Sequence, residues 1–186
     1  MINNSRLHLI NFFSFVANPN NPQYPKISQK EKIKNIFFYF FPIQFIICGI
    51  VLWYPVAIAE KLQLFNKLNS TADEEDIFLT IISAVIIAPL IEEWLFRYPL
   101  GINRRKYYFK WLYYSLSVLF GLIHIFTYDF DHTHLPYIPF ITMTQIVSGF
   151  IFGYIRIVYG FLYGILLHSL FNILGVIWHY TIGFSL

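Results

Sequence analysis

Residues 77–100, IFLTIISAVIIAPLIEEWLFRYPL, are the stretch that decides the fold. The segment is long and apolar enough for a helix across the ~30 Å hydrocarbon core of a bilayer, which takes about 20 residues. Three ionisable side chains nevertheless lie near its end: Glu92, Glu93 and Arg97. A charged side chain in a bilayer costs at least ~2.5–3.5 kcal/mol on insertion scales, so a cluster of three is expected only where it serves a function. We therefore expect a polar site inside the membrane.

The composition of the whole chain also indicates lipid as its solvent. The 186 residues are 57% hydrophobic and only 12% charged, whereas soluble domains carry about 25% charged residues. The mean hydropathy is +0.55. The net charge of +3 is small, so a nucleic-acid-binding surface is not expected. Cys48 is the single cysteine, so the chain forms no internal disulfide. These features predict an all-α, polytopic membrane helical bundle and an integral membrane protein.

Five apolar segments are long enough to span the membrane, and the loop charges fit that number. The segments are 36–59, 77–100, 111–128, 137–155 and 161–183. Lysines and arginines are concentrated before the first, after the second and after the fourth segment, and the other loops are acidic or lack them. By the positive-inside rule, this alternation predicts a cytoplasmic N-terminus and an external C-terminus.

The first 35 residues form a separate segment in this layout. Residues 1–35 are expected to be cytoplasmic or interfacial, and residues 36–186 to form the membrane-embedded domain. Leu7–Ala17 is apolar but short, and Asn and Pro residues follow it directly. A signal peptide is the alternative, but Arg6 is the only basic residue ahead of the apolar run. We expect a short N-terminal interfacial helix.

The ionisable residues of the second and third spans suggest a catalytic carboxylate and imidazole. Glu93 and Arg97 are four residues apart, so they share a helix face and can neutralise each other. Glu92 lies about 100° round the helix and has no such partner, which makes it a candidate general base or acid. In the third span, His124 follows Phe120 by four residues. A buried core histidine is the alternative for His124.

The fifth span adds a second imidazole and an amide. His168 and Asn172 share a helix face, and both donate hydrogen bonds without a charge. Hydrogen bonding between membrane helices is the alternative role for the pair. At 1.5 Å per residue, Glu92 and His168 lie about 10 Å from the cytoplasmic side and His124 about 15–20 Å. The spacing thus predicts that Glu92 and His168 lie at similar depths in the membrane and that His124 lies deeper.

Together these residue types suit the hydrolysis of a carbonyl compound. A carboxylate and an imidazole can hold and deprotonate water, while an imidazole and an amide can stabilise an oxyanion. The same residues could instead hold a metal, because Glu92, His124 and His168 resemble a His₂Glu site for a divalent ion such as zinc. No cofactor is therefore certain. The HExxH spacing is absent. A second possible metal site is the loop Asp129–His134, where ordinary solvated side chains are the alternative.

Three motifs resemble those of the CPBP family of intramembrane proteases, which includes the type II CAAX prenyl endopeptidases and the bacterial Abi-type proteins. They are an EExxxR motif at Glu92–Arg97, an FxxxH motif at Phe120–His124 and an HxxxN motif at His168–Asn172. They occur in the family's order, each inside an expected span. The resemblance covers about residues 80–180.

The resemblance implies an intramembrane endopeptidase that works without a covalent intermediate. By motif position, Glu92 and His124 would activate water, and His168 with Asn172 would form the oxyanion hole. The Glu93–Arg97 pair would shape and neutralise the site. The family has been described both as metalloproteases and as glutamate-dependent enzymes, so the resemblance leaves a metal at Glu92, His124 and His168 open.

The resemblance also implies a location and a class of substrate. A short bacterial form of the family would lie in the inner membrane and cleave a membrane or membrane-proximal peptide or protein. Five spans are fewer than the approximately eight of eukaryotic members, and the missing helices would include those that shape a prenyl-binding groove. Prenylated substrates are therefore less expected than other membrane-proximal peptides. The alternatives are a non-catalytic immunity or scaffold protein of the same fold, and a proton-coupled transporter. The sequence lacks the repeated halves with broken helices that many transporters have.

Overall fold

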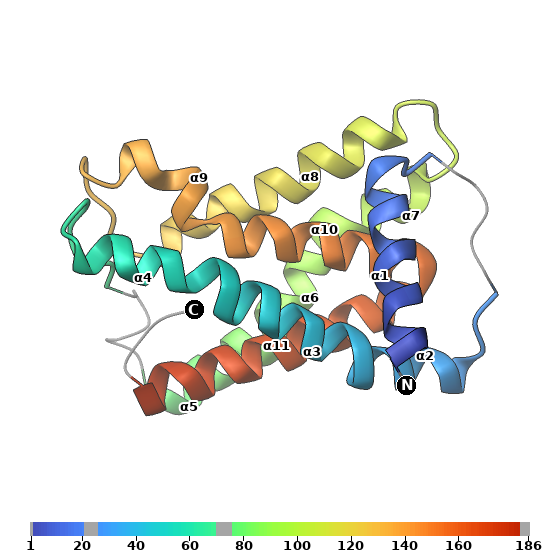
Figure 1. Cartoon of the computed structure of the whole chain (residues 1–186), viewed down its shortest axis with the longest axis horizontal. Coiled ribbons are helices and arrows are strands. Elements are labelled where there is room, and N and C mark those ends of the chain that lie inside the picture. Colours follow the sequence, from blue (N-terminus) through green and yellow to red (C-terminus); the bar gives the residue numbers. More distant parts are fainter. Residues whose placement is uncertain (1, 21–25, 70–75, 183–186) are drawn as a thin grey trace.

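The computed structural model describes residues 2–20, 26–69 and 76–182. Within these ranges the chain is a bundle of helices, and most of them run along the long axis of the molecule (Figure 1). Four helices are long and apolar enough to cross a membrane, and a bent pair of helices brings the number to five. The predicted all-α membrane bundle is therefore confirmed.

The first two spans are continuous helices that alternate between α-helical and π-helical segments. Span one, Gln29–Lys61, consists of α2 (Gln29–Asn35), η1 (Ile36–Phe40), α3 (Phe41–Gln44), η2 (Phe45–Leu52) and α4 (Trp53–Lys61). Span two, Ile77–Asn103, consists of α5 (Ile77–Ile82), η4 (Ser83–Ile87), α6 (Ala88–Glu92), η5 (Glu93–Arg97) and α7 (Tyr98–Asn103).

Prolines account for the four π-helical segments. Each segment ends two or three residues before a proline: Pro42, Pro55, Pro89 and Pro99. Proline has no backbone N–H, and its ring clashes with the carbonyl four residues earlier. Wider turns with i→i+5 hydrogen bonds relieve that clash while the helix continues across the membrane. Glu93 and Arg97 lie at the two ends of one such segment, η5.

The last three spans complete the bundle. They consist of α8 (Phe109–Ile123) with the 3₁₀ turn η6 (His124–Thr127), then η7 (Leu135–Tyr137), α9 (Ile138–Ile141) and α10 (Met143–Val158), and finally α11 (Phe161–Ile182). The fourth predicted span is bent by 41° between Ile141 and Met143. At the bend, the hydroxyl of Thr142 donates to the Ile138 carbonyl over 2.8 Å, a contact that often bends helices.

The N-terminal helix α1 (Ile2–Ala17) runs across the bundle in Figure 1. Phe12 and Phe15 are buried and make edge-to-face contacts with Tyr154 of α10, at ring-centroid distances of 5.5 and 5.2 Å. The predicted N-terminal helix is therefore present, and its place at the membrane interface stays a prediction.

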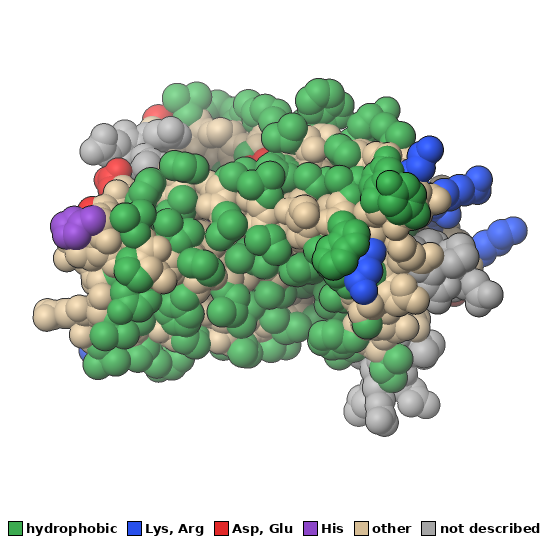
Figure 2. All heavy atoms as spheres, turned by 90° about the horizontal axis from the view of Figure 1, so that it is seen from above, with side chains coloured by type: hydrophobic (Ala, Val, Ile, Leu, Met, Phe, Trp, Pro, Cys, Tyr) green, Lys and Arg blue, Asp and Glu red, His purple; other side chains and the backbone are tan. Residues whose placement is uncertain are grey.

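The surface of the bundle matches a protein embedded in lipid. Apolar side chains cover the middle of the molecule, and most visible lysines and arginines gather at one end (Figure 2). Large side chains such as Phe78, Trp111 and Leu162 are more than 60% exposed. An apolar belt between charged ends is expected of an integral membrane protein, and that prediction is confirmed. The orientation of the N-terminus stays a prediction.

Candidate active site

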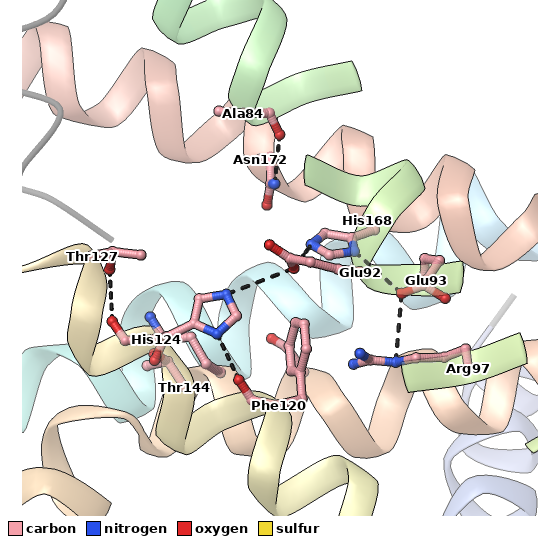
Figure 3. A network of polar contacts seen from close by, with 12 residues as sticks. Ala84, Glu92, Glu93, Arg97, Phe120, His124, Thr127, Thr144, His168 and Asn172 are labelled. Carbon is pink, nitrogen blue, oxygen red and sulfur yellow. Dashed lines mark hydrogen bonds and ion pairs between the residues drawn. The ribbon is translucent and has the colours of Figure 1, made fainter. Parts of the chain in front are cut away.

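The structure brings the predicted site residues of three spans together (Figure 3). Glu92 Oε2 at the end of α6 lies 3.8 Å from His124 Nε2 in η6 and 3.6 Å from His168 Nε2 in α11. The depth mismatch expected for His124 is therefore absent. Figure 1 shows α8 running obliquely to α10, so counting residues along each helix misjudged relative depth.

Hydrogen bonds at the Nδ1 atoms of His124 and His168 fix the orientation of the two rings toward Glu92. His124 Nδ1 is 2.6 Å from the Phe120 carbonyl oxygen, a contact that requires Nδ1 to carry hydrogen and donate it. His168 Nδ1 donates in the same way to Glu93 Oε1 over 3.2 Å. In the neutral rings, both Nε2 atoms are then acceptors that face a carboxylate. This arrangement suits groups that share protons with water.

Glu93 and Arg97 form the buried ion pair that their spacing predicts. Arg97 Nε lies 3.5 Å from Glu93 Oε1, and the two side chains are 1% and 0% exposed. The guanidinium carbon is 3.7 Å from the centroid of the Phe120 ring, so the aromatic face helps to stabilise the charge. Since Glu93 also accepts from His168, the pair connects the buried charge to the imidazole beside Glu92.

Two residues that support this arrangement were not predicted. Gly164 of α11 lies against Glu93, and a Cβ at this position would lie 2.9 Å from Glu93 Oε2. Phe152 of α10 stacks on His168 with a centroid distance of 4.4 Å and an interplanar angle of 21°. Neither residue type marks a site by itself, because glycine and phenylalanine are common throughout membrane helices.

Asn172 has a partner that its motif does not predict. Its Nδ2 donates to the backbone carbonyl of Ala84 over 2.7 Å (Figure 3). In η4 the N–H of Ala88 bonds to the carbonyl of Ser83, five residues earlier. The next bond in that ladder would come from Pro89, which has no N–H. The Asn172 amide thus supplies the donor that Pro89 lacks, and its second amide hydrogen remains for another acceptor.

Comparison with protein families gives a match over residues 74–174, more than half of the chain, to the type II CAAX prenyl endopeptidase Rce1-like family. The chain belongs to this family. All six predicted site residues lie within the matched region. Membership confirms the resemblance to intramembrane CAAX-type proteases at the level of the family. Comparisons with curated proteins and with solved structures gave no match.

In this Rce1-like chain a cavity of about 80 Å³ borders the two histidines. A single water needs roughly 10–15 Å³ of such volume, so several fit. Two of its lining residues are in contact, since the Ser148 hydroxyl of α10 donates to Cys48 Sγ at 3.5 Å. Behind them, Gln44 of α3 donates to Ser148 Oγ over 3.1 Å. The full lining consists of Cys48, Phe120, His124, Thr144, Gln145, Ser148, Phe152, His168, Phe171 and Asn172.

The residues of a possible His₂Glu metal site are present beside one another. Among residues 2–20, 26–69 and 76–182, no three or more His, Cys, Asp or Glu side chains are grouped around a common ion position. Glu92 Oε2 lies 3.8 and 3.6 Å from the Nε2 atoms of His124 and His168, so these three side chains are the ones that would hold a divalent metal.

Hydrogen bonds organise the loop Asp129–His134, the second possible metal site. The Asp131 carboxylate accepts hydrogen bonds from the Thr133 hydroxyl and, over 2.5 Å, from Asn66 Nδ2, and these bonds hold its pKa below the usual range. His134 Nδ1 accepts from the Asp131 N–H, and Nε2 donates to the Asn66 carbonyl over 2.9 Å. The loop is thereby fastened to the segment that follows α4.

Proposed function

We propose that this Rce1-like protein hydrolyses a peptide bond with a water molecule activated by Glu92 and His124. The observation that carries the proposal is the position of Glu92 Oε2, within 3.8 Å of both imidazole Nε2 atoms. These separations exceed a direct hydrogen bond, and Glu92 Oε2 forms no hydrogen bond with any residue in the described ranges. Polar groups at such separations suit a bridging water.

In the proposed reaction, Glu92 takes a proton from the water and the oxygen attacks the peptide carbonyl carbon. The carbonyl oxygen becomes an oxyanion, the C–N bond breaks, and the proton passes from Glu92 to the leaving amine. His124 orients the water through Nε2, because its Nδ1 is bound to the Phe120 carbonyl. These steps need no covalent intermediate with the enzyme and no serine or cysteine nucleophile.

We propose that His168 and Asn172 stabilise the oxyanion. His168 donates to the oxyanion from Nε2 when that atom carries a hydrogen, and the contact of its Nδ1 with Glu93 Oε1 orients the ring for this role. Asn172 has one amide hydrogen engaged with Ala84 and a second one for the substrate. Arg97 holds the Glu93 carboxylate in place through their 3.5 Å pair. Removing one donor from an oxyanion hole commonly costs about 10²–10³ in kcat.

The proposed substrate is a membrane or membrane-proximal peptide, because the catalytic groups lie within the spans. We propose the bacterial inner membrane as the location, with the N-terminus in the cytoplasm. Accessibility of cysteines introduced into the two terminal segments, in a Cys48→Ser background, tests the orientation. Labelling of the N-terminal cysteine from outside intact cells would contradict it.

The decisive experiment compares the peptide termini in cells that contain the wild-type protein with those in cells that contain Glu92→Gln at equal expression. Termini found only with the wild type would identify both the activity and its substrate. General acid–base catalysis contributes about 10²–10⁴-fold, so the variant should lose nearly all cleavage. Glu60→Gln, outside the site, is the matched control. Identical sets of termini under several growth conditions would favour the non-catalytic immunity or scaffold function.

A further inference from the structure

A second cavity, of about 300 Å³, lies at the lysine- and arginine-rich end of the bundle. Three cations line it: Lys32 of α2, Arg104 directly after α7, and Arg156 in the last turn of α10. No aspartate or glutamate is among its lining residues. The nearby Glu31 side chain is held by the Ser28 hydroxyl over 2.9 Å. The cavity is therefore strongly positive.

Two of the cations are held in place by backbone groups. Lys32 Nζ donates to the Tyr159 carbonyl over 2.6 Å, and Arg156 Nε donates to the Arg97 carbonyl over 3.2 Å. Gly101 leaves the room that the Arg156 guanidinium occupies, since a Cβ there would overlap that group. Lysine has three donors and arginine five, so each retains donors for a ligand. Preorganised cations of this kind bind phosphate through charge-assisted hydrogen bonds.

The position of the cavity indicates which anion it meets. Span one begins beside Lys32, span two ends just before Arg104, and the fourth span ends at Val158, two residues after Arg156. Three span ends on one side of a membrane define the depth of the lipid headgroups. Two exposed apolar side chains, Ile102 and Leu162, lie within two residues of lining residues in the chain and suit contact with acyl chains. Basic pockets between membrane helices are known to bind anionic headgroups.

We infer that this cavity binds the phosphate of an anionic phospholipid headgroup. The ligand is recognised by its phosphate oxygens and by its net negative charge, so a zwitterionic lipid with the same phosphate binds more weakly. The inference does not depend on the proposed peptidase function, because binding is measured without any peptide substrate.

The test uses the purified full-length protein and native mass spectrometry with dioleoylphosphatidylglycerol or dioleoylphosphatidylcholine. We expect preferential retention of phosphatidylglycerol, and a drop of roughly 30-fold in its affinity for Lys32→Gln/Arg104→Gln. The matched control is Lys30→Gln/Arg105→Gln, which removes two neighbouring cations that do not line the cavity. Equal loss in both variants would overturn the inference in favour of diffuse surface attraction.

Two further arms separate the remaining outcomes. Equal retention of the two lipids would overturn the preference for an anionic headgroup, and displacement of phosphatidylglycerol by millimolar inorganic phosphate would assign the site to free phosphate instead. If the double variant fails to fold, Arg104→Gln and Arg105→Gln provide the same comparison singly, because both arginines are exposed. A selective loss with Arg104→Gln then supports the inference, and equal effects overturn it.

Discussion

The amide of Asn172 donates a 2.7 Å hydrogen bond to the backbone carbonyl of Ala84, in the π-helical turn just before Pro89. Because Pro89 has no N–H, that carbonyl has no donor from its own helix. A freed carbonyl in lipid must find a partner elsewhere. One residue of the HxxxN motif therefore joins α11 to span two, in addition to the catalytic role proposed for it.

This hydrogen bond predicts that the contribution of Asn172 to stability can be restored without restoring its contribution to activity. We expect Asn172→Ala to lower the free energy of unfolding by about 1 kcal/mol, the usual range for a hydrogen bond between membrane helices. Adding Pro89→Ala restores an N–H to the helix, so the double variant should regain that stability but not the activity. Unfolding in a denaturing detergent, beside peptide cleavage, measures both. Strictly additive losses of stability would contradict the prediction.

The buried Glu93–Arg97 pair predicts strong non-additivity in stability. Glu93→Gln leaves the Arg97 charge without its carboxylate, and Arg97→Met leaves Glu93 without its cation. Breaking one partner of a buried pair costs about 3–5 kcal/mol, whereas replacing both is often nearly neutral. We therefore expect the double variant to be more stable than either single variant in the same unfolding measurement.

Activity should not return in that double variant. His168 would lose the carboxylate that orients its ring through Nδ1, so oxyanion stabilisation fails even in a stable bundle. Arg97→Lys separates the effect of charge from that of shape, because lysine keeps the positive charge but lacks the planar guanidinium that lies on the Phe120 ring. Full cleavage by the double variant would show that Glu93 acts only in folding.

Sequence patterns predicted the spans well because the cost of exposing polar groups to lipid leaves a strong signal. Alternating loop charges and long apolar runs located five spans, with bounds within a few residues for most of them. The long extension of span one back to Gln29 was missed, because lysines there look like a loop. In the structure, a Ser28–Glu31 capping box begins that helix.

The site was harder to predict because its contacts depend on how helices incline and approach. Spacing paired Glu93 with Arg97 correctly, since both lie on one helix. It misjudged the depth of His124, which depends on the inclination of α8. It also missed Gly164 and Phe152, whose importance comes only from the residues opposite them, Glu93 and His168. No pattern within one helix carries that information.

The close approach at Gly164 predicts a specific loss of activity. Gly164→Ala would place a methyl group 2.9 Å from Glu93 Oε2, so the carboxylate and the imidazole that it orients must shift. A misplacement of about 1 Å can cost 10²-fold in rate. Stability should change little, because alanine is favoured over glycine in helices by about 1 kcal/mol.

A second substitution distinguishes a shifted carboxylate from general damage. Glu93→Asp shortens the side chain by one methylene and withdraws the carboxylate from the new methyl group. We expect Gly164→Ala/Glu93→Asp to recover part of the cleavage that Gly164→Ala loses. The single Glu93→Asp variant is the control, and a double variant that is no better than the worse single one would refute the steric explanation.

The last prediction concerns metal dependence. Glu92, His124 and His168 are the donor types of a zinc site, but the described residues contain no grouped set of three such ligands. The two Nδ1 atoms are bound to Phe120 and Glu93, which leaves two Nε2 acceptors and one carboxylate to hold a water and its protons. The proposed activation of water by Glu92 and His124 needs no metal, so cleavage by the purified protein is expected to persist after treatment with a strong chelator and removal of the chelator. Loss of cleavage that added Zn²⁺ restores in the wild type would overturn the glutamate-dependent mechanism. Glu92→Gln, which should stay inactive with or without zinc, controls for contaminating metalloproteases.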